Sequence, residues 1–209
     1  ELKEVAEICY EESVLVFSDE IHADLTLPPH KHRPFAMVSE KARMNSVTFM
    51  SPSKAFNMPG LTASHALIFN PKLRRKFRTY LESSELDLGH VFAFLAVEAA
   101  YSHGTEWLDQ CLAYIQGNID YVDEFTKQHT PKIKVIRPQA SFLVWLDCRE
   151  MGLSQDALND FFVDKAHLAL NNGVAFGEEG EGFMRLNVAS PRSVLEKAMK
   201  QLADAYAAL

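Results

Sequence analysis

Three short apolar runs, at residues 14–17, 47–50 and 63–69, stand out in the first part of the sequence. Each contains branched or aromatic residues and is bounded by polar or turn-forming residues, which is the pattern of a buried strand. The segments between the runs are long enough for crossover connections, and such connections join parallel neighbours. The sequence therefore predicts an α/β protein in which these runs form part of a mostly parallel sheet.

Polar residues that could take part in catalysis or binding follow the first two runs. Asp19 and His22 come after the first run, and Ser51, Ser53 and Lys54 come after the second. A lysine at a strand exit, flanked by small hydroxyls, can lose solvation and act as a nucleophilic amine, as Schiff-base chemistry requires. Taken alone, each residue is also compatible with a plain structural role, such as a solvated surface lysine or a turn aspartate.

The rest of the chain shows helical and strand-like patterns that divide it in two. Helices are expected at residues 1–10, 72–83, 87–103, 105–129, 155–166 and 191–209, and further strands at 132–137, 141–147 and 184–188. Ser154 is a good N-cap for the helix that follows it. We place a domain boundary within the long helix, which gives domains at 1–115 and 116–209.

Composition and charge exclude several functional classes. The net charge of −7 and the pI near 5.6 argue against a nucleic-acid surface. No apolar stretch approaches the roughly 20 residues that a membrane span requires. Three isolated cysteines match no zinc spacing and favour a reducing cytoplasm. The His30 and His32 pair lacks further ligands, so no metal site is expected.

Three ordered motifs resemble one enzyme family. They are S-D-E-I-H at 18–22, S-P-S-K-A-F-N at 51–57 with G-L at 60–61, and R-L-N at 185–187. Together they resemble the fold-type I pyridoxal-phosphate enzymes, and most closely the C–S lyase (cystathionine β-lyase-like) group of the class I/II aminotransferase superfamily. The resemblance implies the C-terminal portion of the aspartate-aminotransferase-like fold. Residues 1–115 would belong to the cofactor-binding large domain and 116–209 would form the small domain. Because family members are about twice this length, we expect only the C-terminal half here.

The resemblance also implies a cofactor, pyridoxal 5'-phosphate, and residues that hold it. Lys54 would bind the cofactor covalently and later remove the α-proton of the substrate, and Asp19 would bind the pyridine nitrogen. Ser51, assisted by Ser53, would bind the phosphate. His22 would contact the 3′-oxygen or orient Asp19.

Substrate recognition is implied at a third position. Arg185 would hold the α-carboxylate of an amino acid with its guanidinium fork, although a solvent-facing arginine on an alternating strand is the plain alternative. Many related aminotransferases carry an arginine eight residues after the lysine, whereas this chain has Thr62. That departure favours the lyase group.

The expected function of the intact enzyme is β-elimination from a cystathionine- or cysteine-type amino acid, giving a thiol, pyruvate and ammonia. An aminotransferase on the same scaffold is the first alternative, and a non-catalytic interaction module derived from this fold is the second. The family's active sites lie at a dimer interface, which implies a homodimer. We expect the 209-residue chain alone to expose apolar surface in its first part and to be inactive.

Overall fold

The computed structural model describes residues 1–209 and divides into two compact units, Glu1–Asp109 and Gln110–Leu209. The dividing point falls within one long helix, α6 (Thr105–His129), whose bounds match the prediction. Each unit has a sheet of its own. No helix has both the length and the apolar character needed to cross a membrane.

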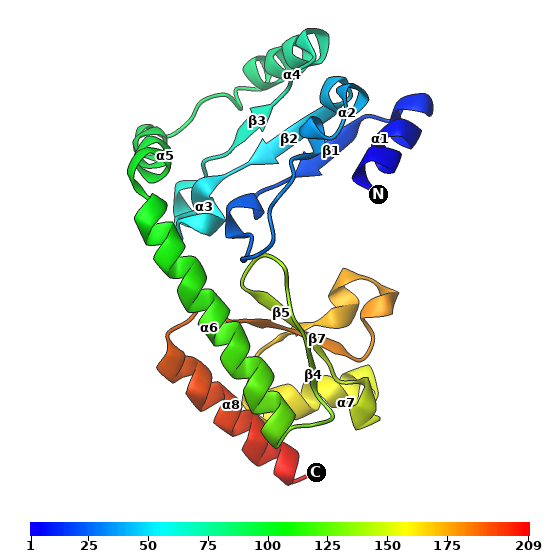
Figure 1. The fold of residues 1–209 in the computed structure, drawn as a ribbon, viewed down its shortest axis with the longest axis vertical. Helices are drawn as coiled ribbons and strands as arrows, with labels where there is room; N and C mark the ends of the chain where they lie inside the picture. The colour runs from blue at the N-terminus through cyan, green and yellow to red at the C-terminus, as the bar shows by residue number, and fades with distance from the viewer. The chain divides into compact units, whose positions relative to one another are not determined.

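The first unit contains a three-stranded sheet in the order β1-β2-β3 (Figure 1). Its strands are β1 (Val16–Asp19), β2 (Ser46–Met50) and β3 (His65–Leu67). β1 and β2 are parallel, with Asp19 opposite Phe49, as the sequence predicts. The chain between them passes through α2 (Glu40–Met44) and two 3₁₀ turns, η1 (Ala23–Leu25) and η2 (Phe35–Met37), and so returns to the start of the sheet.

The direction of β3 differs from the expected crossover arrangement, because β3 runs antiparallel to β2. Residues 51–64, which connect the two strands, contain only the four-residue helix α3 (Pro52–Ala55) and the turn η3 (Pro59–Leu61). A parallel connection needs a longer crossover, usually a full helix, to carry the chain back to the other end of the sheet. The short connection instead reverses the chain at the same end.

The core of the first unit lies on one face of its sheet. Ala6 from α1 (Leu2–Glu11), Phe35 from η2 and Ala42 from α2 pack together with Val16 of β1. The opposite face is partly covered through a ring contact between Phe49 and Phe77 of α4. Phe17, also on that face, remains 64% exposed.

Two helices lead from the sheet to α6. Asn70 caps α4 (Pro71–Ser83) by accepting hydrogen bonds from the backbone nitrogens of Lys72 and Leu73, and proline occupies the first turn. α5 (Val91–His103) starts four residues later than predicted and buries only Ala93.

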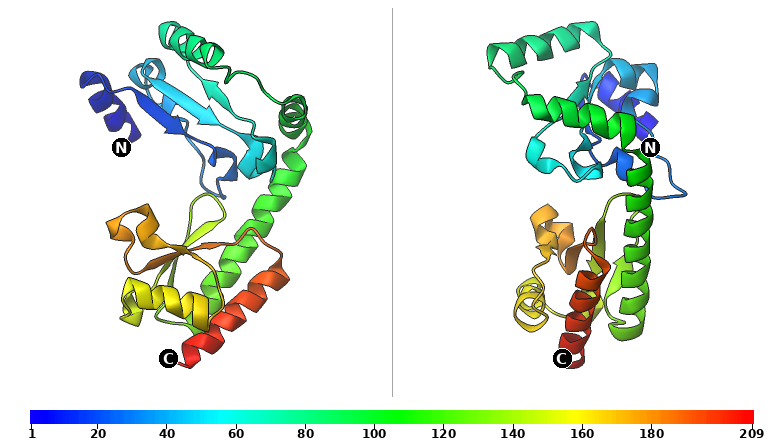
Figure 2. Two further views of the ribbon diagram at one scale, coloured as in Figure 1. Left: turned by 180° about the vertical axis from the view of Figure 1, so that it is seen from behind. Right: turned by 90° about the vertical axis from the view of Figure 1, so that its left-hand side faces the viewer.

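The second unit contains a four-stranded antiparallel sheet in the order β4-β5-β7-β6. The strands are β4 (Lys134–Ile136), β5 (Leu143–Asp147), β6 (Asn171–Asn172) and β7 (Phe183–Asn187). Alternate residues on β5 and β7 point into a core that includes side chains from α6 and from α8 (Arg192–Ala207); the buried set includes Val144, Leu146, Met184, Leu186, Ile119, Val122, Leu195 and Met199. Figure 2 shows from two further sides that α8 runs beside α6.

The helix predicted at 155–166 is present, but it changes from an α-helix to a π-helix partway along. Ser154 caps α7 (Gln155–Asp160) by accepting a hydrogen bond from the backbone nitrogen of Ala157, and the chain continues as a π-helical turn, η5 (Phe161–Lys165). Phe161 and Phe162 are both buried there. The two rings pack against each other in an edge-to-face arrangement with centroids 5.2 Å apart.

Candidate functional site

The ends of β1 and β2 bring two of the predicted site segments to one edge of the first sheet. Because the strands are parallel and Asp19 lies opposite Phe49, the residues that follow both strands leave the sheet on the same side. This is the edge at which open α/β sheets bind ligands. The topology therefore places Asp19 and the loop that begins at Ser51 at neighbouring positions.

Asp19 is the last residue of β1 and is exposed. Its Oδ1 accepts a hydrogen bond of 3.2 Å from the backbone nitrogen of Ile21, which shapes the turn after the strand. Side chains alternate along a strand, so Asp19 lies on the same face as Phe17, opposite the core. The carboxylate is consequently available to a ligand on the open face.

His22 occupies the N-cap position of η1 and is half-buried. Its backbone oxygen accepts a hydrogen bond of 3.0 Å from the nitrogen of Leu25. Leu25 is fully buried, so this short turn is anchored in the core. His22 is therefore held three residues after Asp19 on a well-packed turn.

Ser51 and Ser53 shape the start of the lysine segment. Ser51 is buried and caps α3, with its Oγ accepting a hydrogen bond of 3.1 Å from the backbone nitrogen of Ser53. The Ser51 hydroxyl donates to the backbone oxygen of Ala63 at 2.6 Å and lies 2.8 Å from the Ser53 hydroxyl. These contacts close the two ends of the loop on each other.

Lys54 lies on the exposed side of α3, and aromatic packing holds the residues that follow it. The Phe56 ring stacks on Trp107 with centroids 6.0 Å apart and meets the edge of Tyr101 at 5.8 Å. The Tyr101 hydroxyl donates to Asp24 Oδ2 at 3.4 Å. Burial, together with the Asp24 charge, raises the pKa of Tyr101 to about 12, so this phenol stays protonated.

Arg185 lies on β7 in the second unit, on the face opposite the core. Its Nη2 donates to Asn171 Oδ1 at 3.0 Å, and its guanidinium carbon lies 4.3 Å from the ring centre of Phe176. Its Nε is buried and has no hydrogen-bond partner. A guanidinium whose Nε has no hydrogen-bond partner suits a carboxylate ligand that accepts two hydrogen bonds.

Aromatic side chains surround the position of Arg185. Trp145 lies opposite it on β5, and the Trp145 ring meets the edges of Phe176 and Phe183. A cavity of about 300 Å³ opens on this face, lined by Ile136, Trp145, Phe176, Glu179, Gly180 and Phe183. Arg185 therefore stands beside an apolar hollow.

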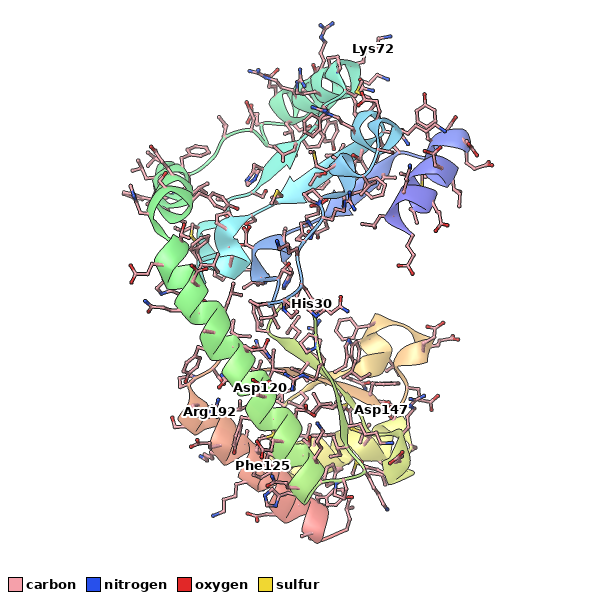
Figure 3. The ribbon with its side chains drawn as sticks, in the orientation of Figure 1. His30, Lys72, Asp120, Phe125, Asp147 and Arg192 are labelled. Atoms are coloured by element: carbon pink, nitrogen blue, oxygen red, sulfur yellow. The ribbon has the colours of Figure 1, made fainter.

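Several side chains that shape the site were not anticipated from the sequence. Glu20 lies next to Asp19 in the S-D-E-I-H motif, and its acidic character directly after an apolar strand was the available signal. Asn171 and Phe176 contact Arg185 from other parts of the chain. Arg192 starts α8 and is half-buried, with its Nε donating to Asn118 Oδ1 at 2.9 Å (Figure 3).

The chain belongs to the class I and II aminotransferase family, whose model matches residues 1–202. It is 41% identical over 202 residues to cystathionine beta-lyase PatB of Bacillus subtilis, covering 97% of this chain and 52% of that protein. It is 35% identical over 210 residues to protein MalY of Escherichia coli, covering 100% of this chain and 53% of that protein. The chain thus spans about half the length of the curated relatives it matches.

Solved structures show the same relationship. Cystalysin from Treponema denticola, which contains pyridoxal 5'-phosphate, superposes with a TM-score of 0.93 at 31% identity, covering 100% of this chain and 53% of cystalysin. The pyridoxal-phosphate-bound C–S lyase from Staphylococcus hominis superposes with a TM-score of 0.86 at 30% identity, covering 99% of this chain and 52% of that lyase. The fold is therefore the α/β fold of the pyridoxal-phosphate aminotransferase family.

Proposed function

We propose that the native protein containing this chain is a pyridoxal-phosphate-dependent C–S β-lyase that acts on cystathionine- or cysteine-type amino acids. The observation that carries the proposal is the common sheet edge at which Asp19 and the Ser51–Lys54 segment leave two parallel strands. The relatives named as cystathionine beta-lyases and C–S lyases support the reaction type.

The residues present have the chemistry that the cofactor requires. The exposed Asp19 carboxylate can face a protonated ring nitrogen. The Ser51 and Ser53 hydroxyls can donate to a phosphate if they give up their present partners, which are the Ala63 backbone oxygen and each other. Lys54 presents an exposed amine for covalent attachment, and His22, three residues after Asp19, would contact the 3′-oxygen or orient Asp19. Pyridoxal phosphate, when bound, withdraws electrons from the substrate's Cα and so lowers the barrier to losing its proton.

The chain's own residues would then move one proton and hold one carboxylate. The Arg185 fork binds the substrate α-carboxylate, and its buried, unpartnered Nε supplies one of the two donors. The amine of Lys54 takes the proton from Cα as a general base. The thiolate leaves from Cβ, and hydrolysis of the remaining fragment yields pyruvate and ammonia.

The proposal extends to the organisation of the enzyme. We assign residues 1–115 to the cofactor-binding large domain and 116–209 to the small domain. We also assign the enzyme to the cytoplasm as a homodimer. These assignments rest on the family resemblance and on the free cysteines.

An aminotransferase is the second candidate, because the chain is also 28% identical over 207 residues to the aspartate aminotransferase of Geobacillus stearothermophilus. Thr62, which is exposed and has a left-handed backbone (φ 48°), takes the place where many aminotransferases carry a phosphate-binding arginine. The absence of that cation favours the lyase.

Covalent labelling tests the proposal most directly. In the native protein containing this chain, reduction with borohydride should fix the cofactor on the peptide that contains Lys54. Lys54→Ala should abolish both the label and the visible absorption band while leaving the far-ultraviolet circular dichroism unchanged, because the exposed Lys54 side chain contributes little packing. Lys72→Ala, an exposed lysine on α4 (Figure 3), is the matched control and should behave as wild type.

Product analysis separates the candidates. Pyruvate released from cystathionine without any keto-acid acceptor identifies the lyase, whereas turnover that requires an acceptor identifies an aminotransferase. Label on Lys72 or Lys76 in place of Lys54 contradicts the assignment. A protein that shows no visible band at all would indicate a non-catalytic module.

A further inference from the structure

Glu20 is a buried carboxylate that uses both of its oxygens. It follows β1 directly and is 7% exposed. Its Oε1 accepts hydrogen bonds from the Ser18 hydroxyl at 3.0 Å and the Phe35 backbone nitrogen at 2.9 Å, and its Oε2 lies 2.6 Å from His32 Nε2. Burying a carboxylate is costly unless donors compensate it. These three donors explain how Glu20 is accommodated.

The contact between Glu20 and His32 is a short hydrogen bond between two side chains. In it, His32 Nε2 can donate to Glu20 Oε2, since a carboxylate oxygen accepts such a bond. Hydrogen bonds to charged groups are roughly twice as strong as those between neutral groups. His32 is therefore a substantial anchor, although its side chain is still 32% exposed.

The Glu20 carboxylate ties together the two ends of a loop that has little backbone hydrogen bonding of its own. Residues 26–34 include Pro28, Pro29 and Pro34, which lack backbone donors. Within this stretch the backbone of His30 donates to Leu27, and the loop then reaches Phe35 in the core. His32 and Phe35 both return to Glu20, so the end of β1 and the end of the loop meet at one side chain.

Glu20 also sits directly behind the proposed cofactor residues. Its backbone nitrogen donates to the Phe49 oxygen at 2.8 Å, which extends the pairing with β2 one residue beyond Asp19. Because side chains alternate, Glu20 points toward the core while Asp19 points to the open face. The turn from Asp19 to His22 therefore begins at a residue that is fixed on its inner side.

We propose that Glu20 and His32 are positioning residues: the hydrogen bond between them orders the Asp19–His22 turn and thereby sets the direction of the Asp19 carboxylate. The part that concerns catalysis rests on the proposed function. The part that concerns the order of the turn does not, and the two can be measured separately.

The test uses four variants of the native protein that contains this chain. His32→Ala removes the donor, and His32→Gln restores one, since the Gln amide can donate to Glu20. Glu20→Ala removes the acceptor and risks misfolding, so the His32 variants keep the test decisive. His30→Ala, a neighbouring histidine that is exposed and has no side-chain contact to Glu20, is the matched control.

Nuclear magnetic resonance measures the order of the turn without reference to the cofactor. The backbone amide of Ile21, which bonds Asp19 Oδ1, should exchange with solvent about tenfold or more faster in His32→Ala, as expected from losing a hydrogen bond of this strength. His32→Gln and His30→Ala should exchange as wild type. Unchanged Ile21 exchange in His32→Ala would overturn the proposal, whatever the cofactor data show.

Kinetics and absorption measure the catalytic consequence. In His32→Ala, kcat should fall about 10–100-fold, as small misplacements of catalytic groups do, while KM stays within about twofold because Arg185 is untouched. The visible band should shift, and His32→Gln should recover both properties. Faster Ile21 exchange with unchanged kcat and spectrum would refute the positioning role. A wild-type protein with no visible band would refute the proposed function instead, and the exchange data would still decide whether the hydrogen bond between Glu20 and His32 orders the turn.

Discussion

At the scale of single residues, Arg185 is held by two contacts and keeps one buried donor without a hydrogen-bond partner. Asn171 accepts from Nη2 and the Phe176 ring lies against the guanidinium plane, while the buried Nε has no partner. An aromatic ring under a guanidinium restrains its plane, and the amide restrains its rotation. A side chain held in this way loses little conformational freedom when a carboxylate binds.

Arg185→Lys is therefore expected to weaken substrate binding although the charge is kept, because an ammonium group cannot reproduce the two-donor fork. The loss should be about 1.5–3 kcal/mol, or roughly a tenfold to hundredfold rise in the dissociation constant of the amino acid. Binding to the native protein containing this chain can be followed by the change in cofactor absorption.

Arg149→Lys provides the control for this change. Arg149 pairs with Asp147 through two nitrogens and lies 4.8 Å from the Phe183 ring centre, so it combines the same types of contact at a different place. Its replacement should leave amino-acid affinity unchanged. Equal affinities in wild type and Arg185→Lys would rule out the carboxylate role.

At the scale of elements, the buried carboxylate of Asp123 helps to join α6 to the β4–β5 connection. Asp123 is buried on α6, where Lys127 binds its Oδ1 at 2.9 Å and Arg137 binds its Oδ2 at 2.8 Å. Burial alone would raise the pKa of Asp123, but the hydrogen bonds and charges of Lys127 and Arg137 outweigh it and lower that pKa. The ionised form is thus favoured in the folded protein.

Because the folded pKa of Asp123 is depressed, its contribution to stability is present above the unfolded pKa, near 4, and is lost as pH falls through the folded value. Asp123→Asn should lower the free energy of unfolding by about 1–3 kcal/mol at pH 7. The difference between variant and wild type should shrink below about pH 4. Urea unfolding of the native protein that contains this chain, followed across pH, measures both effects.

Asp120→Asn is the comparison for Asp123, since Asp120 pairs with the same Arg137 from an exposed position. An exposed ion pair contributes at most about 1 kcal/mol, so Asp120→Asn should lower the free energy of unfolding by less than Asp123→Asn does. A loss at Asp120 as large as that at Asp123, or a difference for Asp123 that does not depend on pH, would contradict this account.

At the scale of the whole molecule, the two units differ in how well they cover their apolar side chains. α5 is apolar on all sides, a property of buried helices, yet it exposes Val91, Phe92, Phe94 and Leu95. In the second unit, helices α6 and α8 supply a continuous set of buried side chains to the sheet. The second unit is thus the more self-sufficient of the two.

The 209-residue chain studied alone should therefore self-associate and should release no pyruvate from cystathionine. Amides in β5, β7 and α8 should be protected from hydrogen exchange more strongly than those in β1, β3 and α5, because local stability follows burial. Light scattering and exchange mass spectrometry measure these properties. A chain that is monomeric, yellow and active would show that the exposed apolar side chains of the first unit do not need to be buried by further protein.

Features set by neighbouring residues could be predicted from the sequence alone. The bounds of α6, the cap of α7 and the strand character of β2 follow from side-chain periodicity and capping chemistry within a few residues. The motifs around Asp19, Lys54 and Arg185 also lie in contiguous segments, so the order of residues along the chain is enough to propose their chemistry.

The tertiary structure decided what depends on residues far apart in the chain. The antiparallel direction of β3, the joining of Glu20 to His32 and Phe35, and the placement of Asn171 and Phe176 against Arg185 all arise from such contacts. A residue's local sequence determines its backbone preference and its chemistry. Its partners depend on which distant segments pack against it, because burial and hydrogen bonding are satisfied by the fold as a whole.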